Sequence, residues 1–153
     1  MSYTANQFLA VLKKCDKALA IEEVNCPELS EDGKSEFKVR LKELNGTLVD
    51  LWTKVFEEIV EDPSTQGKYG SPSQLVVALS IVDQGGDRVF ATHDFKSHSS
   101  VGLMPSNVKE RLAAVAYRLS KMRRVDQEDL VKNLESSQED ALQSTSPGSE
   151  ASA

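Results

Sequence analysis

The sequence predicts an α+β fold that is predominantly helical: an N-terminal helix, a β-hairpin, three to four further helices and a disordered C-terminal tail. Apolar residues recur at helical spacing in several segments, and near residue 40 they alternate with charged residues. The 153 residues, 39% of them hydrophobic, carry a net charge of -6. These values fit one acidic domain, which we place at residues 1–135, followed by an acidic tail at 136–153.

The first predicted element is a short helix that ends near Lys17. Thr4 and Gln7 have the spacing of a capping box, in which each side chain satisfies a backbone amide at the start of a helix. Beyond them, apolar residues from Phe8 to Cys15 form one broad face.

A β-hairpin is predicted at about residues 19–41. The segment from Leu19 to Cys26 is rich in Ile and Val, and the segment from Ser35 to Leu41 alternates apolar and charged side chains. Asp32-Gly33 supplies a turn between them. One face of this hairpin is expected to be solvated, because the charged residues of the second strand all point the same way.

Two helices are predicted in the middle of the chain, at about 47–61 and 72–83. The first opens at Thr47, repeats apolar residues at helical spacing and stops at Asp62-Pro63. A polar linker follows, and Ser71-Pro72 begins the second helix. Its apolar run reaches Val82 and is apolar almost all round, so we expect it to be the central element of the fold, and periodicity alone would also allow a buried strand.

The remaining elements are predicted after the Gly85-Gly86 break. Residues 87–95 are expected to form a loop with a helical turn capped by Thr92, and an amphipathic helix follows at about 106–122. Asp126 is expected to begin a short last helix. Beyond Glu135 the only large apolar residue is Leu142, so that segment cannot bury enough apolar area to offset its ordering entropy.

Charge and composition exclude several classes of function. Residues 1–134 carry 18 basic and 20 acidic side chains, which gives no electrostatic footprint for nucleic-acid binding. No apolar stretch is long enough to span a membrane, and the first residues lack the pattern of a signal peptide. We therefore expect a cytosolic protein in which Cys15 and Cys26 are buried free thiols.

The sequence offers little for catalysis, so we expect a protein that is not an enzyme, with no catalytic residues, cofactor or metal. Gly33-Lys34-Ser35 imitates the end of a phosphate-binding loop, but the first glycine is missing and the segment lies between strands. Two histidines, His93 and His98, lie five residues apart, a spacing that does not bring them together on a helix. Asp83 to Asp87 lacks the ligand pattern of a calcium loop and is predicted to be a tight turn.

The order of segments resembles the tail assembly chaperones of long-tailed, siphovirus-type bacteriophages. The resemblance is carried by Gln7-Phe8-Leu9-Ala10, by Val24-Asn25-Cys26-Pro27-Glu28-Leu29, and by residues 38–46. It continues through residues 81–90, where an apolar run is followed by Asp, Gly and Phe, and through the helix from Pro105 to Leu119. Departures are the less acidic segment at 92–96 and a longer linker at 62–73.

This resemblance implies a non-enzymatic chaperone that binds the tape measure protein, keeps it soluble and leaves before the tail is mature. It implies action in the cytoplasm of the infected host, and absence from the mature virion. It also implies a longer, frameshifted product that recruits tail tube protein. We expect a homo-oligomer on the client, with no nucleic acid and no membrane among its partners. Val131-Lys132-Asn133 could be encoded by an adenine run on which the ribosome slips.

The apolar faces of the helices predicted at about 47–61 and 106–122 are the predicted protein-binding surfaces, one for the client and one for self-association. The same residues are also the best candidates for the core, and that alternative is favoured for any one of them. A basic cluster at the end of the helix predicted at about 106–122 could bind an acidic peptide, or it could only complement the helix dipole. The candidate residues are Leu48, Leu51, Trp52, Val55, Phe56, Val108, Leu112, Val115, Leu119, Arg118 and Lys121.

Two other classes of function remain compatible with the sequence. A small cytosolic helical adaptor or antitoxin-like regulator would bind one folded protein partner in a complex of low order. A small enzyme would need a pocket that joins His93 or His98 to a carboxylate.

Overall fold

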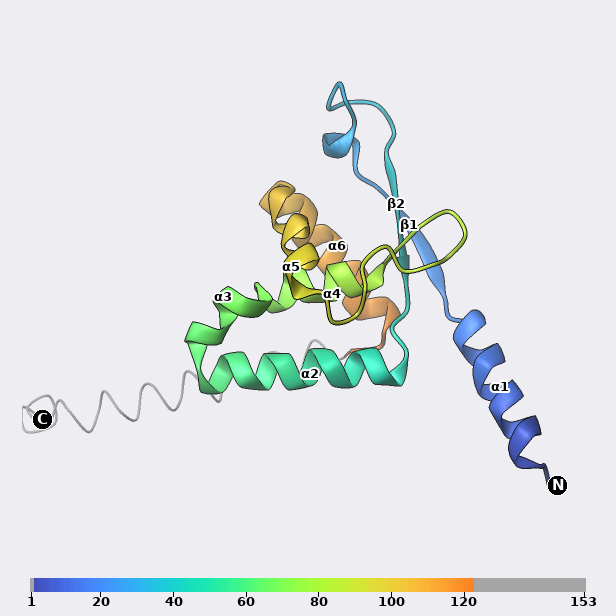
Figure 1. Ribbon diagram of the computed structural model, residues 1–153. Coiled ribbons are helices and arrows are strands. Elements are labelled where there is room, and N and C mark those ends of the chain that lie inside the picture. Colours follow the sequence, from blue (N-terminus) through green and yellow to red (C-terminus); the bar gives the residue numbers. More distant parts are fainter. Residues whose placement is uncertain (1, 123–153) are drawn as a thin grey trace, which may run out of the picture. The chain divides into compact units, whose positions relative to one another are not determined.

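The computed structural model describes residues 2–122, which form a group of helices with a small antiparallel sheet beside it (Figure 1). The predicted α+β class is confirmed. The elements, in chain order, are α1 (Ala5–Lys17), β1 (Ile21–Asn25), η1 (Pro27–Leu29), β2 (Lys38–Lys42), α2 (Gly46–Glu61), η2 (Pro63–Thr65), α3 (Gln66–Tyr69), α4 (Pro72–Ser80), β3 (Ile81–Val82), α5 (Phe95–His98), η3 (Ser99–Leu103) and α6 (Ser106–Leu119).

The sheet has the strand order β1-β2-β3, and both pairings are antiparallel. β1 and β2 form the predicted hairpin, in which Val24 lies opposite Val39. The loop between them is closed by the Asp32 carboxylate, which accepts hydrogen bonds from the backbone amides of Lys34 and Ser35 at 2.9 and 2.7 Å. The Ser35 hydroxyl also donates to this carboxylate, and its hydrogen bond, together with those from the two amides, favours the ionised form and holds the pKa of Asp32 far below its usual value.

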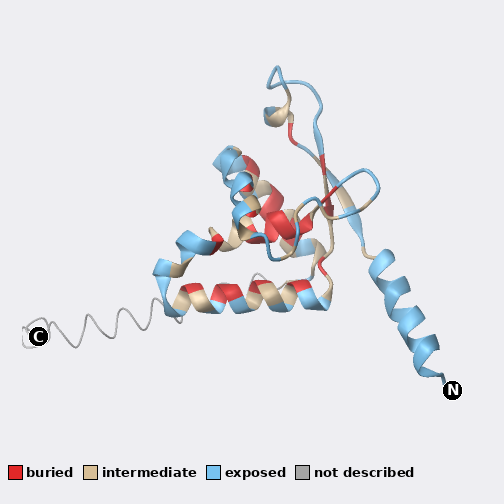
Figure 2. Ribbon diagram, in the orientation of Figure 1, coloured by how far each residue is buried: buried red, intermediate tan, exposed pale blue. Residues whose placement is uncertain are grey.

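Helix α4 is the centre of the core, as its apolar sequence predicts. Every residue from Leu75 to Ser80 is buried, and α4 packs against both α6 and α2 (Figure 2). The Ser80 hydroxyl is satisfied inside the core because it donates to the Val76 carbonyl oxygen at 2.7 Å. Trp52 of α2 donates its indole N–H to the Pro72 carbonyl oxygen at 2.9 Å, which ties α2 to the start of α4.

The helix starts show which polar side chains act as caps. Ser71 accepts from the Gln74 amide at 3.1 Å, which confirms the predicted start of α4. The predicted opening of α2 at Thr47 is wrong, because the Asn45 side chain accepts from the Leu48 amide and α2 begins at Gly46. Helix α6 ends at Leu119, a few residues before the predicted bound.

The apolar run predicted as one helix at 72–83 changes structure at Ile81. Helix α4 ends at Ser80, and the next two residues pair with β2 as strand β3. Ile and Val at this point are β-branched and favour a strand where a sheet edge is available. The predicted tight turn follows, with Asp83 accepting from the Gly85 amide at 2.8 Å and Gly86 at a φ of 85°.

Short helical turns occupy the linker, which was expected to be irregular, and the segment near residue 95, where a helical turn was expected. The linker after α2 forms η2 and α3, with Pro63 at the start of the first. The predicted cap at Thr92 is wrong, since the helical turn is α5 and Asp94 caps it by accepting from the Ser97 amide at 3.2 Å. In both places, the turn begins at an Asp whose carboxylate accepts a nearby amide.

Helix α1 differs from the other long helices because none of its residues is buried (Figure 2). The prediction that both cysteines are buried is therefore half wrong. Both are free thiols, but Cys15 on α1 is exposed, whereas Cys26 is fully buried. The predicted apolar face of α1 is present, but it does not pack into the core.

One compact unit extends to Lys121. The predicted domain boundary near residue 135, the short helix after Asp126 and the tail at 136–153 lie outside the described residues. No helix in the described part of the chain is both long and apolar enough to cross a membrane.

Candidate functional site

The candidate site begins with the exposed apolar side of α1, which we call the arm face: Phe8, Leu9, Val11, Leu12 and Cys15. The side chains of Phe8, Leu9 and Leu12 are 43%, 53% and 48% exposed. An isolated exposed apolar residue is ordinary, but a contiguous set on one helix marks an interaction surface. The arm face is thus a surface that the described chain leaves uncovered.

Local interactions explain how α1 can be a helix without packing against the core. The Thr4 hydroxyl accepts from the Gln7 amide at 3.2 Å, and the Gln7 side chain accepts from the Thr4 amide at 2.8 Å. Tyr3 stacks on Phe8 with ring centroids 5.2 Å apart, which places the two residues as a hydrophobic staple. Lys14 and Lys17 lie in the last turn, where positive charge favours the helix dipole. These end signals confirm the predicted capping box.

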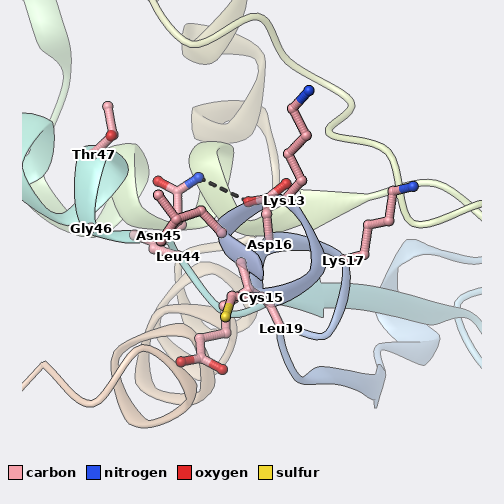
Figure 3. Close-up of a pocket in the computed structure, with 11 residues that line it drawn as sticks. Lys13, Cys15, Asp16, Lys17, Leu19, Leu44, Asn45, Gly46 and Thr47 are labelled. Atoms are coloured by element: carbon pink, nitrogen blue, oxygen red, sulfur yellow. Dashed lines mark hydrogen bonds between the residues drawn. The ribbon is translucent and has the colours of Figure 1, made fainter. Parts of the chain in front are cut away.

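The carboxyl half of α1 faces the junction between β2 and α2 across an open groove of about 790 Å³ (Figure 3). Both walls of this groove contribute apolar side chains, and α1 and the end of β2 also contribute charged side chains. We call this the corner groove. It is lined by Leu12, Lys13, Cys15, Asp16, Lys17, Leu19, Glu43, Leu44, Asn45, Gly46 and Thr47.

Hydrogen bonds fix the α1 wall of the corner groove to the other wall. The Asn45 side chain donates to Asp16 at 3.1 Å while it also caps α2 (Figure 3). The Ala20 amide donates to the Glu43 carboxylate at 3.2 Å, and the Glu43 amide donates to the Ala20 carbonyl oxygen at 2.8 Å. Asn45 therefore serves two elements at once, and the connection between α1 and β1 is held against the end of β2.

Arg88 holds the other wall of the corner groove, at the end of β2, in place. Its guanidinium donates to the carbonyl oxygens of Lys42, Glu43 and Leu79 at 3.1, 2.9 and 3.0 Å. Burial lowers the pKa of Arg88, and the nearby Asp16 carboxylate opposes that shift. Arg88 thus links the end of β2 to the end of α4. This wall of the groove is therefore attached to the core.

A second residue from far along the chain holds the same corner. The Ser120 hydroxyl, just after α6, accepts from the backbone amide of Leu44 at 3.0 Å, and Leu44 itself is buried. The wall formed by residues 43–47 is therefore set by contacts with Arg88 and Ser120. Sequence patterns could not reveal this, because neither contact is local.

The residues predicted as binding surfaces mostly form the core. Leu48, Trp52, Val55 and Phe56 of α2 are buried, as are Val108 and Leu112 of α6. Leu51, Val115 and Leu119 are half-buried. This was the alternative that the same apolar pattern favoured, and six of these side chains cannot contact a partner unless the core opens.

The two charged candidates on the α6 side are exposed. Arg118 forms an ion pair with Glu22 of β1, which joins α6 to the edge of the sheet. Lys121 follows α6 and has a φ of 55°. A role for either residue in binding an acidic peptide stays a prediction.

One histidine shares an open pocket of about 530 Å³ with a carboxylate, since His93 and Asp94 both line it. The hydrogen bonds of the Asp94 carboxylate go to Ser97 and not to an imidazole. His98 is fully buried, and its Nε2 lies 2.8 Å from the Ala91 carbonyl oxygen, while His93 is exposed. Within residues 2–122 neither imidazole is hydrogen-bonded to a carboxylate, and no group of His, Cys, Asp and Glu could hold a metal ion. The corner groove contains no imidazole among its lining residues.

Sequence reasoning found the apolar face of α1 but did not select it as a site. Two features of the sequence could have identified it. The segment has strong helix-capping residues, and its net charge is positive whereas that of the whole chain is negative. Residues 2–20 carry three lysines and one aspartate, whereas the whole chain has a net charge of -6. Such a helix needs little from the core and is electrostatically distinct from it.

Fold and site together define a small α+β domain with an uncovered amphipathic helix beside a groove. Such a surface is suited to holding another apolar-striped helix. Compared with protein-family models, with curated proteins and with solved structures, the chain has no significant match in any of the three.

Proposed function

We propose that this protein is a non-enzymatic tail assembly chaperone that binds the phage tape measure protein and keeps it soluble during tail morphogenesis. The observation that carries the proposal is the arm face, an apolar helix surface with no cover in the described chain. The resemblance in the order of segments supplies the identity of the client. The two arguments are independent, since one comes from exposure and the other from sequence order.

The physical requirement is simple. A long helical client with an apolar stripe aggregates unless that stripe is covered, and an amphipathic helix covers such a stripe by packing apolar face against apolar face. Many weak contacts along one client add up, because each bound copy covers a different segment. The net charge of -6 keeps such a complex dispersed.

Further parts of the proposal rest on the resemblance. The protein acts in the cytoplasm of the infected host, assembles in several copies on the client and is absent from the mature virion. A longer frameshifted product recruits the tail tube protein. Reading the codons of residues 131–133 tests the slippage site, and codons without an adenine run would contradict it at that position.

The decisive experiment is co-expression with the tape measure protein of the same phage, followed by co-purification and sizing. We expect soluble tape measure only when the chaperone is present, in a complex that contains several copies of this chain. Insoluble client together with monomeric protein would contradict the proposal. A stable complex of low order with one other folded protein would instead favour the adaptor or antitoxin-like class.

Two variants connect this experiment to the structure. Leu12→Ser removes an apolar side chain from the arm face, whereas Ala10→Ser makes a similar polar change on the opposite side of α1. Because no residue of α1 is buried, both variants are expected to fold normally. Only Leu12→Ser is expected to lower the yield of soluble client, and equal yields would show that the arm face is not used.

A further inference from the structure

A second open pocket is formed by α3 and the segment around α5, and positive side chains gather in it. We call it the basic pocket. Its volume is about 530 Å³, and its side chains come from two stretches that are distant in the sequence. The proposed function makes no use of it, because the arm face belongs to a different element. The basic pocket is lined by Gly67, Lys68, His93, Asp94, Phe95, Lys96 and Ser99.

Aromatic packing holds the two stretches of the basic pocket together. Tyr69 of α3 is buried and meets Phe95 of α5 edge-on, with ring centroids 4.8 Å apart. The Tyr69 hydroxyl donates to the Glu58 carboxylate at 2.7 Å, which ties α3 to α2. A lysine stands next to each ring in the sequence, so this packing brings Lys68 and Lys96 to one pocket.

The one carboxylate that lines the basic pocket is already hydrogen-bonded. As the cap of α5, Asp94 accepts from the Ser97 hydroxyl at 2.6 Å and from the Ser97 amide at 3.2 Å. These hydrogen bonds, with smaller contributions from nearby positive charges, lower the pKa of Asp94, so its carboxylate stays ionised. Asp94 therefore opposes any anion that enters the pocket, and it is held in place without an ion pair to a lysine.

The lysines of the basic pocket have no acid partner within residues 2–122, where no ion pair involves Lys68 or Lys96. The Lys68 ammonium lies over the Tyr69 ring, 4.9 Å from its centroid, and this contact leaves its charge in place. Ser99 is not an available donor, because its hydroxyl donates to the Lys96 carbonyl oxygen at 2.6 Å. The lining therefore holds two ammonium groups and one carboxylate, with the exposed imidazole of His93 beside them.

We propose that the basic pocket binds a phosphate group, either as free phosphate or as a small phosphomonoester. A phosphate group offers three strong acceptor oxygens and nearly two negative charges at pH 7, which suit the ammonium groups of Lys68 and Lys96 and an N–H of His93. A carboxylate offers one charge and two oxygens, so it meets fewer of these donors. Two lysines and one aspartate leave a single positive charge, so the attraction depends on both lysines. Because these groups are exposed, we expect a dissociation constant in the millimolar range.

The chain contains its own reporter for this site, because it has only two histidines. His93 lines the basic pocket and is exposed, whereas His98 is fully buried and is not part of the lining. Proton NMR follows the imidazole C–H signals of the full chain while inorganic phosphate replaces chloride at constant pH and ionic strength, and His93→Gln assigns them. We expect a saturable shift of the His93 signal, with the His98 signal nearly unchanged. A His93 shift that does not saturate, or equal shifts of both signals, would overturn the proposal.

Charge variants give predictions in opposite directions, and an unchanged His98 signal shows that each variant is folded. Lys68→Gln and Lys96→Gln should each weaken phosphate binding about two- to fivefold, since each removes one exposed charge contact. Asp94→Asn should tighten binding by a similar factor, because asparagine can still cap α5 but does not repel the anion. Lys13→Gln, on α1 and outside this pocket, is the matched control and should leave binding unchanged. Equal weakening by Lys13→Gln, or weaker binding by Asp94→Asn, would overturn the proposal.

Two further probes define the ligand of the basic pocket. Methyl phosphate that binds at least as tightly as inorganic phosphate would assign the pocket to a phosphomonoester, and weaker binding would assign it to free phosphate. Acetate at equal ionic strength should bind more weakly than either, and equal binding of acetate would overturn the choice of phosphate. None of these measurements involves the tape measure protein, so their failure leaves the proposed function untouched, and its failure leaves the basic pocket untouched.

Discussion

At the scale of single residues, the fold depends on a few side chains that join elements far apart in the sequence. Arg88 is the strongest example, because one guanidinium satisfies carbonyl oxygens at the ends of both β2 and α4. Its half-buried charge has no carboxylate hydrogen-bonded to it within residues 2–122. The geometry of the planar guanidinium, and not only its charge, is what the site requires.

The first prediction concerns this geometry. Arg88→Lys should lower the free energy of unfolding by about 1–3 kcal/mol, because an ammonium cannot reach all three carbonyl oxygens that the fork satisfies. Arg118→Lys is the matched control, since its ion pair with Glu22 is exposed and should change stability by less than about 1 kcal/mol. Urea denaturation measures both, and equal losses would contradict the role given to Arg88.

His98 provides the second prediction, which concerns pH. Burial lowers the pKa of His98 below its usual 6.5, although the hydrogen bond to Ala91 and the nearby Asp94 carboxylate oppose the shift. No group in the part of the chain that the structure describes forms a hydrogen bond with its buried Nδ1, so an added proton there would have no acceptor among these residues. The unfolded chain therefore binds a proton first as pH falls, and stability present above pH 6.5 is lost below it.

His98→Gln tests this sign. Glutamine can place an N–H donor near the Ala91 carbonyl oxygen but does not titrate. We expect the free energy of unfolding of the variant to fall less than that of the original protein between about pH 7.5 and about pH 5. Parallel pH profiles would show that His98 contributes nothing to the acid sensitivity.

At the scale of elements, α1 and α2 contrast in how they are stabilised. Both begin at a polar side chain that accepts a backbone amide, Thr4 for α1 and Asn45 for α2. Helix α2 also buries one face in the core, whereas α1 relies on its capping box, its staple and its basic last turn. Isolated helices of this length are marginal in water, so α1 depends on its end signals.

The third prediction compares the two caps. Asn45→Ala should lower the free energy of unfolding by about 1 kcal/mol, because α2 is part of the core. Thr4→Ala should leave that free energy nearly unchanged and instead weaken α1 alone, since no residue of α1 is buried. Amide hydrogen exchange, read separately for residues 5–17 and 46–61, distinguishes the two, and a global loss of protection in Thr4→Ala would contradict the independence of α1.

At the scale of the whole molecule, the domain leaves its N-terminal helix uncovered while the remaining long helices share the core. Helix α4 is covered by α2 and α6, and α6 also contacts strands β1 and β2. The apolar residues of α1 contribute nothing to that core. Stability and partner binding are therefore expected to depend on different residues.

The fourth prediction follows from this separation. Leu9→Ser with Leu12→Ser should change the free energy of unfolding by less than about 0.5 kcal/mol while it lowers the yield of soluble tape measure protein in the co-expression experiment. Val76→Ser, inside α4, should lower the free energy of unfolding by more than about 2 kcal/mol. If the α1 double variant were equally unstable, the arm face would be part of the core and the site would be lost.

Much of the fold could be predicted from the sequence because its elements are specified locally. The helical periodicity of residues 48–60, the alternation around Val39 and the capping box at Thr4 each reflect contacts within a few residues. The central position of α4 could also be inferred, since a segment that is apolar on all sides must be surrounded.

The sequence by itself determined the fold class, the hairpin and the existence of an apolar face on each long helix. Only the tertiary structure decided which of those faces is covered, because a pattern shows that a face is apolar but not whether the chain supplies a partner for it. The tertiary structure also decided that Ile81 pairs with β2 as part of a strand. It likewise decided that Arg88 and Ser120 contact the wall of the corner groove. These outcomes depend on contacts between distant residues, and such contacts exist only once the chain has folded.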